Sequence, residues 1–460
     1  MVCVVVGMLG LQPGCEGPAQ QRSKAVRQPK IKAGFVSGDR RPTPRARRDT
    51  QPRRAPPPRP EFRLEVSSAI VRDILPFTKT RYEEHELGAL FAGLRRLGDP
   101  FCAMVWKKRR WEKEVAARFV RRERLRSYRC GGCRRAFITG CWNFFIMNDR
   151  RPDRDFRLVK HLYGAAAPFD CYSVSFMQPY MMHAQLGCRR LTLLDVDWRI
   201  LDGHLQLLRQ VRTGRVQTVT DVERAVRRLD LGWVAYGGTM TPRARPELDW
   251  FCGDSKVKGQ QQLCRTHLPA FARRFRTLKE VRFQAMALHD ASFDTGREGR
   301  TKVVFMSNAI EVVYTRWWEL KHLLKRAKAS LVMGQKMVLI HHIAGFSGFM
   351  IYELQRHKLG VRLRTICRDR HRLRGRSRTK FMRVQSLAPG KGLSWIRIPA
   401  KTPAPEHAAY FKDHDPLEYY THLDVLAKDR HKAPLCATLL RLHDHMAKKR
   451  ASRPTTGERK

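Results

Sequence analysis

The sequence predicts an α/β protein with a mostly parallel, three-layered sheet. From about residue 168, short apolar runs alternate with segments whose apolar residues recur at helical spacing. Strands that alternate with crossover helices form parallel sheets with helices on both faces. Because such crossovers are right-handed, ligand sites are expected at the carboxyl ends of the strands.

Four segments supply the expected crossover helices. PYMMHAQLG begins with a proline and ends with Gly187, which is typical of helix ends. A second helix is expected at 199–212, a third at 316–328, and a fourth at 349–360, which also ends in glycine. The apolar faces of the second and third helices hold Leu201, Leu205, Leu208 and Val211, and Trp317, Leu320, Leu324 and Ala327, respectively.

Short runs rich in β-branched and aromatic residues supply the expected strands. Most are apolar enough for the interior of a sheet, whereas the last two alternate in polarity as strands near an edge do. The interior strands are expected at 170–177, 191–198, 281–288, 302–308 and 336–343, and the edge strands at 361–369 and 393–399.

Composition divides the rest of the chain. Residues 1–60 are expected to be a disordered tail, because their Pro- and Arg-rich part cannot bury apolar surface. Residues 61–165 are expected to form a basic helical region, since YEEHELGALFAGLRRLG and WEKEVAARFVRRERLR carry apolar residues at helical spacing. The α/β domain then spans 166–400, and a helical extension spans 401–460.

The chain is strongly basic. Its 460 residues include 91 Lys and Arg against 42 Asp and Glu, a formal net charge of +49. Such a charge predicts attraction to polyanions, namely RNA, DNA or an anionic membrane surface. The arginines are spread along the whole chain, so a generally basic composition is the alternative explanation. The densest run, Cys367 to Arg383, either binds phosphates or forms a solvated loop.

Cysteine usage does not indicate a disulfide scaffold, because 12 cysteines are few for this length. Most are expected to be reduced or buried thiols. Cys130, Cys133 and Cys141 resemble part of a zinc site, for which Cys171 or His161 would have to supply a fourth ligand. Buried thiols are the favoured interpretation, and no metal site is predicted.

The expected location is cytoplasmic. No apolar run approaches the ~20 residues of a membrane span. The short apolar start, MVCVVVGMLGLQPGC, lacks a basic leader segment, so export or lipid attachment at Cys15 is the minor alternative.

Two acidic positions follow expected strands. Asp195 and Asp197 end the run LTLLDVDW, where an acid in dinucleotide and nucleoside binders accepts hydrogen bonds from ribose hydroxyls. The alternative is a helix cap or an ion pair, with Asp197 beside Arg199. Asp290, in ALHDAS, either contacts an adenine amino group or forms an Asx turn.

Small polar residues and histidines follow two further strands. Ser307 and Asn308 either contact a substrate or cap the next helix. His341 and His342 end the strand KMVLIHH. Either one imidazole faces the cleft as a general base, or the histidines have a structural role. Trp318 would offer a stacking surface, since Trp317 lies on the core face of its helix.

In their order along the chain, CYSVSFMQPYMMHAQLGCRRLTLLDVDWRILDGH, ALHDAS, VVFMSNAIE and KMVLIHH resemble a class I S-adenosylmethionine-dependent methyltransferase. The resemblance covers Cys171 to Ile398 and implies a Rossmann-like fold and S-adenosylmethionine as cofactor. It implies that Asp197 binds the ribose, supported by Asp195, and that Asp290 neighbours the adenine. The end of the fourth strand also resembles that of the amino-carboxypropyl transferases that make betaine lipids.

The sequence departs from this family at one turn. The family's first strand leads into a Gly-rich turn, which lets the backbone approach the cofactor. Here the turn reads FMQPYMM, without glycine, so Ser173 and Ser175 would supply hydroxyl groups instead.

Two functions are therefore expected. The first is transfer of a methyl or amino-carboxypropyl group to an unknown acceptor. The second is a degenerate, non-catalytic fold that binds RNA or an anionic membrane surface. For the transferase, the expected cofactor contacts are Asp197, Asp195, Asp290 and Ser175, the catalytic residues His341 and Asn308, and the substrate contacts Ser307, Trp318 and His342.

Overall fold

The computed structural model describes most of the chain between residues 60 and 368 and parts of its C-terminal region. All of these residues fall within the unit Arg59–Lys460. The described residues are 60–75, 77–106, 147, 149–164, 169–231, 233–236, 239–242, 247–253, 259–294, 300–310, 315, 317–342, 349–368, 383–385, 395–397, 423, 426–427 and 432–452.

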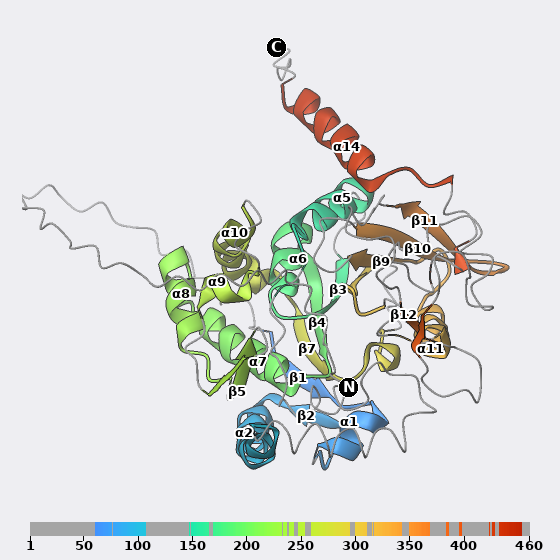
Figure 1. The fold of residues 1–460 in the computed structure, drawn as a ribbon. Helices are drawn as coiled ribbons and strands as arrows, with labels where there is room; N and C mark the ends of the chain where they lie inside the picture. The colour runs from blue at the N-terminus through green and yellow to red at the C-terminus, as the bar shows by residue number, and fades with distance from the viewer. Residues whose placement is uncertain are drawn as a thin grey trace, which may run out of the picture. The chain divides into compact units, whose positions relative to one another are not determined.

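One large sheet organises the described part of the chain (Figure 1). Neighbouring strands pair in parallel from β9 to β1, and antiparallel pairs close both edges. The nine strands lie in the order β11 (Gly360–Cys367), β10 (Phe349–His357), β9 (Lys336–His342), β8 (Lys302–Phe305), β3 (Phe169–Val174), β4 (Cys188–Asp195), β7 (Glu280–Ala285), β1 (Phe62–Glu65) and β2 (Arg81–Glu83).

Helices connect these strands. The crossover from β3 to β4 is α6, and the chain from β4 to β7 contains α7, α8, α9 and α10. The helices of the described residues are α1 (Ala69–Ile74), α2 (Glu84–Trp106), α5 (Asp153–Tyr163), α6 (Gln178–Leu186), α7 (Trp198–Arg212), α8 (Val219–Arg227), α9 (Leu248–Phe251), α10 (Gln260–Arg274), α11 (Trp317–Ala329) and α14 (Cys436–Ala451), with short 3₁₀ turns η2 (Phe275–Thr277) and η3 (Leu288–Asp290).

Alternation along the strands sends side chains into two separate hydrophobic clusters. Val303 and Phe305 of β8 pack into the cluster that contains α5, α6 and α7, whereas Val304 between them packs with α11. Period-two alternation in a strand places successive side chains on opposite faces of the sheet. The α/β class expected from the sequence is therefore the class of the structure, with a mostly parallel sheet.

Local signals explain the elements nearest to the strand ends. Pro179 stands in the first turn of α6, and Gly187 ends the helix with φ 73°, a left-handed conformation that favours glycine. The predicted apolar face of α7 is confirmed, because Leu201, Leu205 and Leu208 are buried. The helices predicted from YEEHELGALFAGLRRLG and at 316–328 are confirmed as α2 and α11, and α14 lies in the C-terminal extension that was expected to be helical.

The prediction of a helix at 349–360 is wrong. This segment is the strand β10, paired antiparallel with β9 and β11. Phe349 to Leu354 are buried on both faces of the sheet, so no period-two alternation marked them as a strand. Gly360 stands at the hairpin turn to β11 with φ 127°, rather than at the end of a helix.

Two further boundaries differ from expectation. Residues 61–165 were expected to be helical, yet 62–65 and 81–83 join the main sheet as β1 and β2. The strand expected at 393–399 is present at Trp395–Arg397 as β13, but it pairs with β12 (Arg383–Gln385) in a sheet of its own. These short strands carry no sequence pattern that identifies their partners, because strand pairing depends on residues distant in the chain. The domain division as a whole stays a prediction.

Six cysteines form disulfides, so the expectation of mostly reduced thiols is wrong for them. The pairs are Cys171–Cys188, Cys252–Cys264 and Cys367–Cys436. Disulfides persist in oxidising compartments and are rare in the cytosol. They therefore count against the cytoplasmic location, which stays a prediction. Cys130, Cys133 and Cys141 lie outside the described residues, as does Cys15.

No helix in the described ranges is long and apolar enough to cross a membrane.

We expect the six paired cysteines to resist alkylation when the purified protein is denatured without reductant. After reduction, all six should be labelled, and mass spectrometry of the peptides locates each label. The chain-entropy model assigns each bond about 3–4.5 kcal/mol of stability, so reductant should also lower the melting temperature. Labelling of Cys171 or Cys188 before reduction would contradict the pairing between β3 and β4.

Candidate functional site

The strand order reverses between β3 and β8. From β3 the chain proceeds through β4 to β7 on one side, while β8 and β9 follow on the other side. In open α/β sheets, ligands bind outside the carboxyl ends of the strands at such a reversal. Polar residues stand at the carboxyl ends of these strands. Two of them, Asp195 and His342, are the last residues of β4 and β9. Those that follow a strand are Ser175 after β3, Asp197 after β4, Asp290 after β7 and Ser307 after β8.

Three non-glycine residues of the described chain have positive φ, and two of them end the central strands. Ser175 follows β3 with φ 74° and Ser307 follows β8 with φ 49°, while Arg151, with φ 57°, precedes α5. Such conformations cost about 1–3 kcal/mol each and persist only where other contacts impose them. Strain of this kind concentrates at binding sites, which makes this sheet edge the candidate site.

The turn after β3 is held by hydrogen bonds on both sides of Ser175. Its N–H donates to Asp195 Oδ2 at 3.4 Å, and His204 Nε2 lies 3.1 Å from its carbonyl oxygen. Burial lowers the pKa of His204 to about 3, so the ring is neutral. Its Nε2–H therefore donates to Ser175, and its Nδ1 accepts from the hydroxyl of Tyr180. The left-handed turn expected of a glycine is here made by a serine.

Asp197 caps α7 and forms a buried ion pair. Its Oδ1 accepts from the Arg199 N–H at 3.0 Å, and its Oδ2 lies 2.6 Å from Arg199 Nη2. Both side chains are 1% exposed. The carboxylate predicted to hold a ribose is therefore occupied by the cap and by Arg199, as in the alternative that the sequence left open.

Asp195 is the last residue of β4 and keeps partial exposure. Its two oxygens accept from the backbone N–H groups of Ser175 and Asp197. Burial, and to a lesser degree the nearby Asp197 charge, raise the pKa of Asp195 to about 7. Because Asp195 is the less buried of the two residues, it is better placed than Asp197 to meet a ligand at the strand end.

Asp290 is bound by neighbouring side chains. Its Oδ2 accepts from Ser68 Oγ at 2.7 Å, and His289 and His322 lie 3.6 and 3.9 Å from its carboxylate. Trp318 is 54% exposed and lies edge-on to His289, with ring centroids 6.0 Å apart. Trp318 is thus an exposed side chain beside His289, as a stacking surface requires. The neighbouring Asp290 joins η3 to the segment before α1.

A buried polar cluster gathers behind the strand ends around Asp149. Ser307 Oγ donates to both of its carboxylate oxygens at 2.8 Å, and Gln178 Nε2 donates to Oδ2 at 2.8 Å. His342 Nδ1 lies 3.2 Å from Oδ1. The side chains of Asp149, Gln178 and His342 are fully buried. One carboxylate therefore ties together β8, β9, α6 and the segment before α5.

His342 supplies the positive charge of this cluster. Burial alone would lower its pKa, but Asp155, at 3.8 Å from Nε2, and Asp149 outweigh burial and raise the pKa to about 9. Burial raises the pKa of Asp155 well above its usual range, against the opposing effect of His342. The cluster therefore places the His342 ring between the carboxyl groups of Asp149 and Asp155, at 3.2 and 3.8 Å.

The other predicted residues occupy different surroundings. His341 is fully buried in β9. Asn308 is partly buried, and its Oδ1 lies 3.3 Å from Ser307 Oγ. The structure thus brings Ser307 and His342 together, and Ser175 with Asp195, but it gives Asp197 and Asp290 other partners. The side chain of Trp317 and residues 369–382 lie outside the described residues.

Sequence reasoning missed Asp149, Asp155 and Gln178. Asp149 and Asp155 lie in NDRRPDRDF, where acids before and within a helix start have an ordinary capping use. Nothing local indicates that Asp149 meets Ser307, which is 158 residues away in the chain. Only the crossover topology brings these two residues into contact.

No family model and no curated protein matches the chain. Among solved structures, the chain is similar to the CcbJ methyltransferase from Streptomyces caelestis, with 9% sequence identity and a TM-score of 0.19. The match covers 47% of this chain and 76% of that chain. A TM-score this low supports no conclusion about the activity of this chain.

We expect His342→Gln to remove a pH-dependent part of the stability. Because the pKa of His342 is raised in the folded state, its contribution is complete below about pH 6.5 and is lost as pH rises through 9. The contribution is on the order of 3 kcal/mol. Thermal unfolding from pH 6 to 10 should show the wild type converging on the variant at high pH. His357→Gln, at an exposed histidine, serves as the control; a constant offset for His342→Gln would contradict the raised pKa.

We expect Ser175→Gly to keep or raise stability, by up to about 1 kcal/mol, because glycine adopts positive φ without strain. Ser173→Gly, in the buried middle of β3, should instead lower stability by about 1 kcal/mol. Chemical denaturation of both variants measures the difference. Equal destabilisation by the two changes would show that the serine conformation carries no strain.

Proposed function

We propose that the chain binds S-adenosylmethionine at the carboxyl edge beside the β3–β8 reversal and transfers a group from it. The observation that carries the proposal is Asp195, a partly exposed acidic residue at the end of the second strand of the β3–α6–β4 unit. An acid at this point accepts hydrogen bonds from the two ribose hydroxyls of a nucleoside. In this proposal Asp195 takes the role that the sequence assigned first to Asp197.

The ribose end of the cofactor fits the residues present. Ser175 gives the turn after β3 the left-handed conformation that glycine provides in the resembling family, and the same turn donates to Asp195. The amino-acid end fits less well. Phe176 and Met177 are fully buried, and the Gln178 side chain accepts from the Met177 N–H at 3.1 Å, at the start of α6. A helix N-terminus that binds its own side chain has fewer N–H groups for an anion.

The proposed division of labour follows from exposure. When bound, S-adenosylmethionine supplies the electrophilic carbon, as a methyl or an amino-carboxypropyl group. Asp195 orients the nucleoside, and Asn308 and Trp318 retain the exposure needed to meet an acceptor. Ser307 and His342 bind Asp149 and act as positioning residues. His341, which precedes His342 in the chain, is fully buried. In transfer between two bound groups, alignment supplies much of the acceleration.

A second function is favoured by the occupied carboxylates. Asp197 is paired with Arg199, and Asp290 accepts a hydrogen bond from Ser68. At the start of α6, the Gln178 side chain binds the Met177 N–H. A protein that kept this fold, lost the cofactor and binds a polyanion through its arginines would have the same features. RNA and an anionic membrane surface are the partners of this alternative.

Titration calorimetry with S-adenosylmethionine distinguishes the two. We expect wild-type binding to be weakened at least about tenfold in Asp195→Asn, since a charged acceptor of two hydroxyl hydrogen bonds is lost. Binding should tighten from pH 6 to pH 8 as Asp195 ionises near pH 7, and this pH dependence should vanish in the variant. Asp197→Asn is the matched control, expected to lower stability but to leave affinity nearly unchanged.

A truncated ligand adds a second comparison. If the amino-acid end has no room, methylthioadenosine, which lacks that end, should bind at least as well as the whole cofactor. Absence of binding by either compound at millimolar concentration would remove the transferase proposal. Weaker binding in Asp197→Asn than in Asp195→Asn would return the ribose contact to Asp197.

A further inference from the structure

A cationic pocket lies between α7 and α8, on a part of the chain that the proposed function does not use. It has a volume of about 550 Å³, which falls within the usual range for small-molecule sites. The C-terminal end of α7, the connecting loop and one side of α8 form its walls. Its lining residues include Arg209, Thr213, Arg215, Val216, Asp221, Arg224, Ala225 and Arg228.

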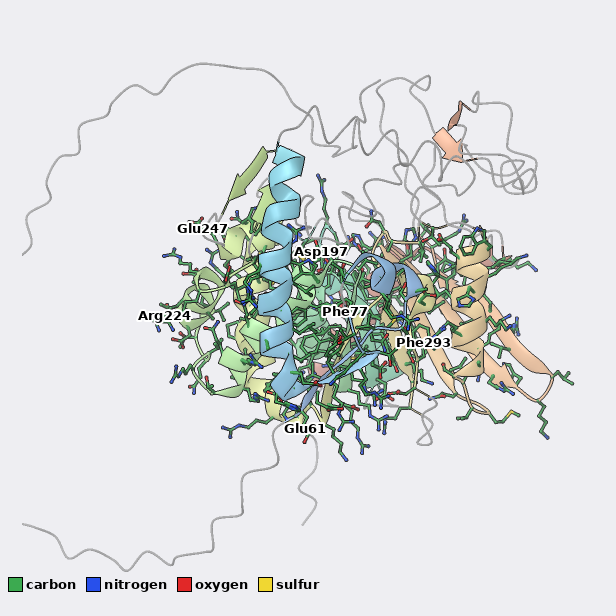
Figure 2. All side chains as sticks on the ribbon, turned by 90° about the horizontal axis from the view of Figure 1, so that it is seen from below. Glu61, Phe77, Asp197, Arg224, Glu247 and Phe293 are labelled. Carbon is green, nitrogen blue, oxygen red and sulfur yellow. A yellow bond between two sulfur atoms is a disulfide. The ribbon has the colours of Figure 1, made fainter. Side chains whose placement is uncertain are left out.

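The pocket has an apolar floor and a charged rim. Val216 is 4% exposed and Ala225 is 2% exposed, so both belong to the packed base. Arg215, Arg224 and Arg228 are exposed around it. Figure 2 shows the labelled Arg224 on the outer side of its helix, away from the labelled Asp197. A site of this kind suits a ligand with both an anionic group and an apolar part.

Asp221, the single acidic residue that lines the pocket, already binds groups of the protein. Asp221 closes a capping box with Thr218 at the start of α8 and lies 3.2 Å from Arg224. Backbone and side-chain hydrogen bonds from Thr218 lower the pKa of Asp221, which keeps it ionised and bound there. It therefore neutralises one arginine of four and leaves a positive excess at the rim.

Nearby acids outside the pocket are paired with other cations. Glu84 binds the guanidinium of Arg212, with Nη1 2.7 Å from Oε2, and only its backbone carbonyl oxygen accepts from Arg209. Glu223, on the other side of α8, lies 3.3 Å from Arg265. Within the described residues, the side chains of Arg215 and Arg228 form no ion pair or hydrogen bond. Their guanidinium groups remain available to an external anion.

We propose that this pocket binds a small phosphorylated ligand. Arginine guanidinium groups match phosphate oxygens with paired, charge-assisted hydrogen bonds. Here they come from three segments of chain and surround a concavity, which favours a compact phosphate group over the extended backbone of a nucleic acid. The apolar floor would contact the part of the ligand that bears the phosphate.

Inorganic pyrophosphate is the probe for the charged part of the site. We expect saturable binding in titration calorimetry, weakened about 10- to 100-fold by Arg228→Glu, because an Arg–phosphate hydrogen bond is replaced by repulsion. Arg227→Glu changes the same charge on the adjacent exposed residue of α8, outside the pocket lining, and should leave affinity within about threefold. Circular dichroism and melting temperature establish that both variants fold.

Single-stranded RNA and vesicles containing a phosphoinositide serve as the other ligands. Equal weakening of pyrophosphate binding by Arg227→Glu and Arg228→Glu would replace the pocket with diffuse surface charge and overturn the proposal. Binding of RNA or vesicles without saturable pyrophosphate binding would also overturn it. The result is independent of S-adenosylmethionine binding, since Asp195→Asn should leave pyrophosphate affinity unchanged.

Discussion

The carboxylate of Asp149 is the constraint on which the site depends. It is fully buried, and a charge in such a place is tolerated only with hydrogen bonds and an opposite charge. Ser307, Gln178 and His342 supply these from three different elements. Meeting this requirement fixes how β8, β9 and α6 approach one another, and it holds Ser307 in its left-handed conformation at the end of β8.

The same arrangement limits what the sheet edge can bind. Gln178 binds both the N–H of Met177, the residue before α6, and the Asp149 carboxylate. Protein groups therefore occupy the start of this helix, near the edge where open α/β sheets bind ligands. The space beyond β4 is different, because Asp195 receives only backbone N–H groups and is partly exposed. At this edge the β4 side thus keeps a partly exposed acidic residue, whereas Ser307 and His342 on the β8 and β9 side bind Asp149.

Charge follows a similar division between paired and available groups. Arg199 and Arg212 are taken up by Asp197 and Glu84, and they act as internal supports of α7. The arginines of the α7–α8 pocket instead surround an apolar floor and one acid, Asp221, which is bound in the capping box of α8. At this pocket the large net charge of the chain is thus concentrated as four arginines around one acid, which the composition could not reveal.

The sequence by itself determined the α/β class, the helices α6, α7 and α11 and most strand positions, because periodicity and helix punctuation are local properties. It also presented both uses of Asp197 without choosing between them. Tertiary structure decided that β10 is a strand, that β1 and β2 complete the sheet, that six cysteines pair, and that Asp149 meets Ser307 and His342. The physical reason is that strand pairing, disulfides and buried charge depend on residues distant in sequence, whose approach only the complete packing specifies.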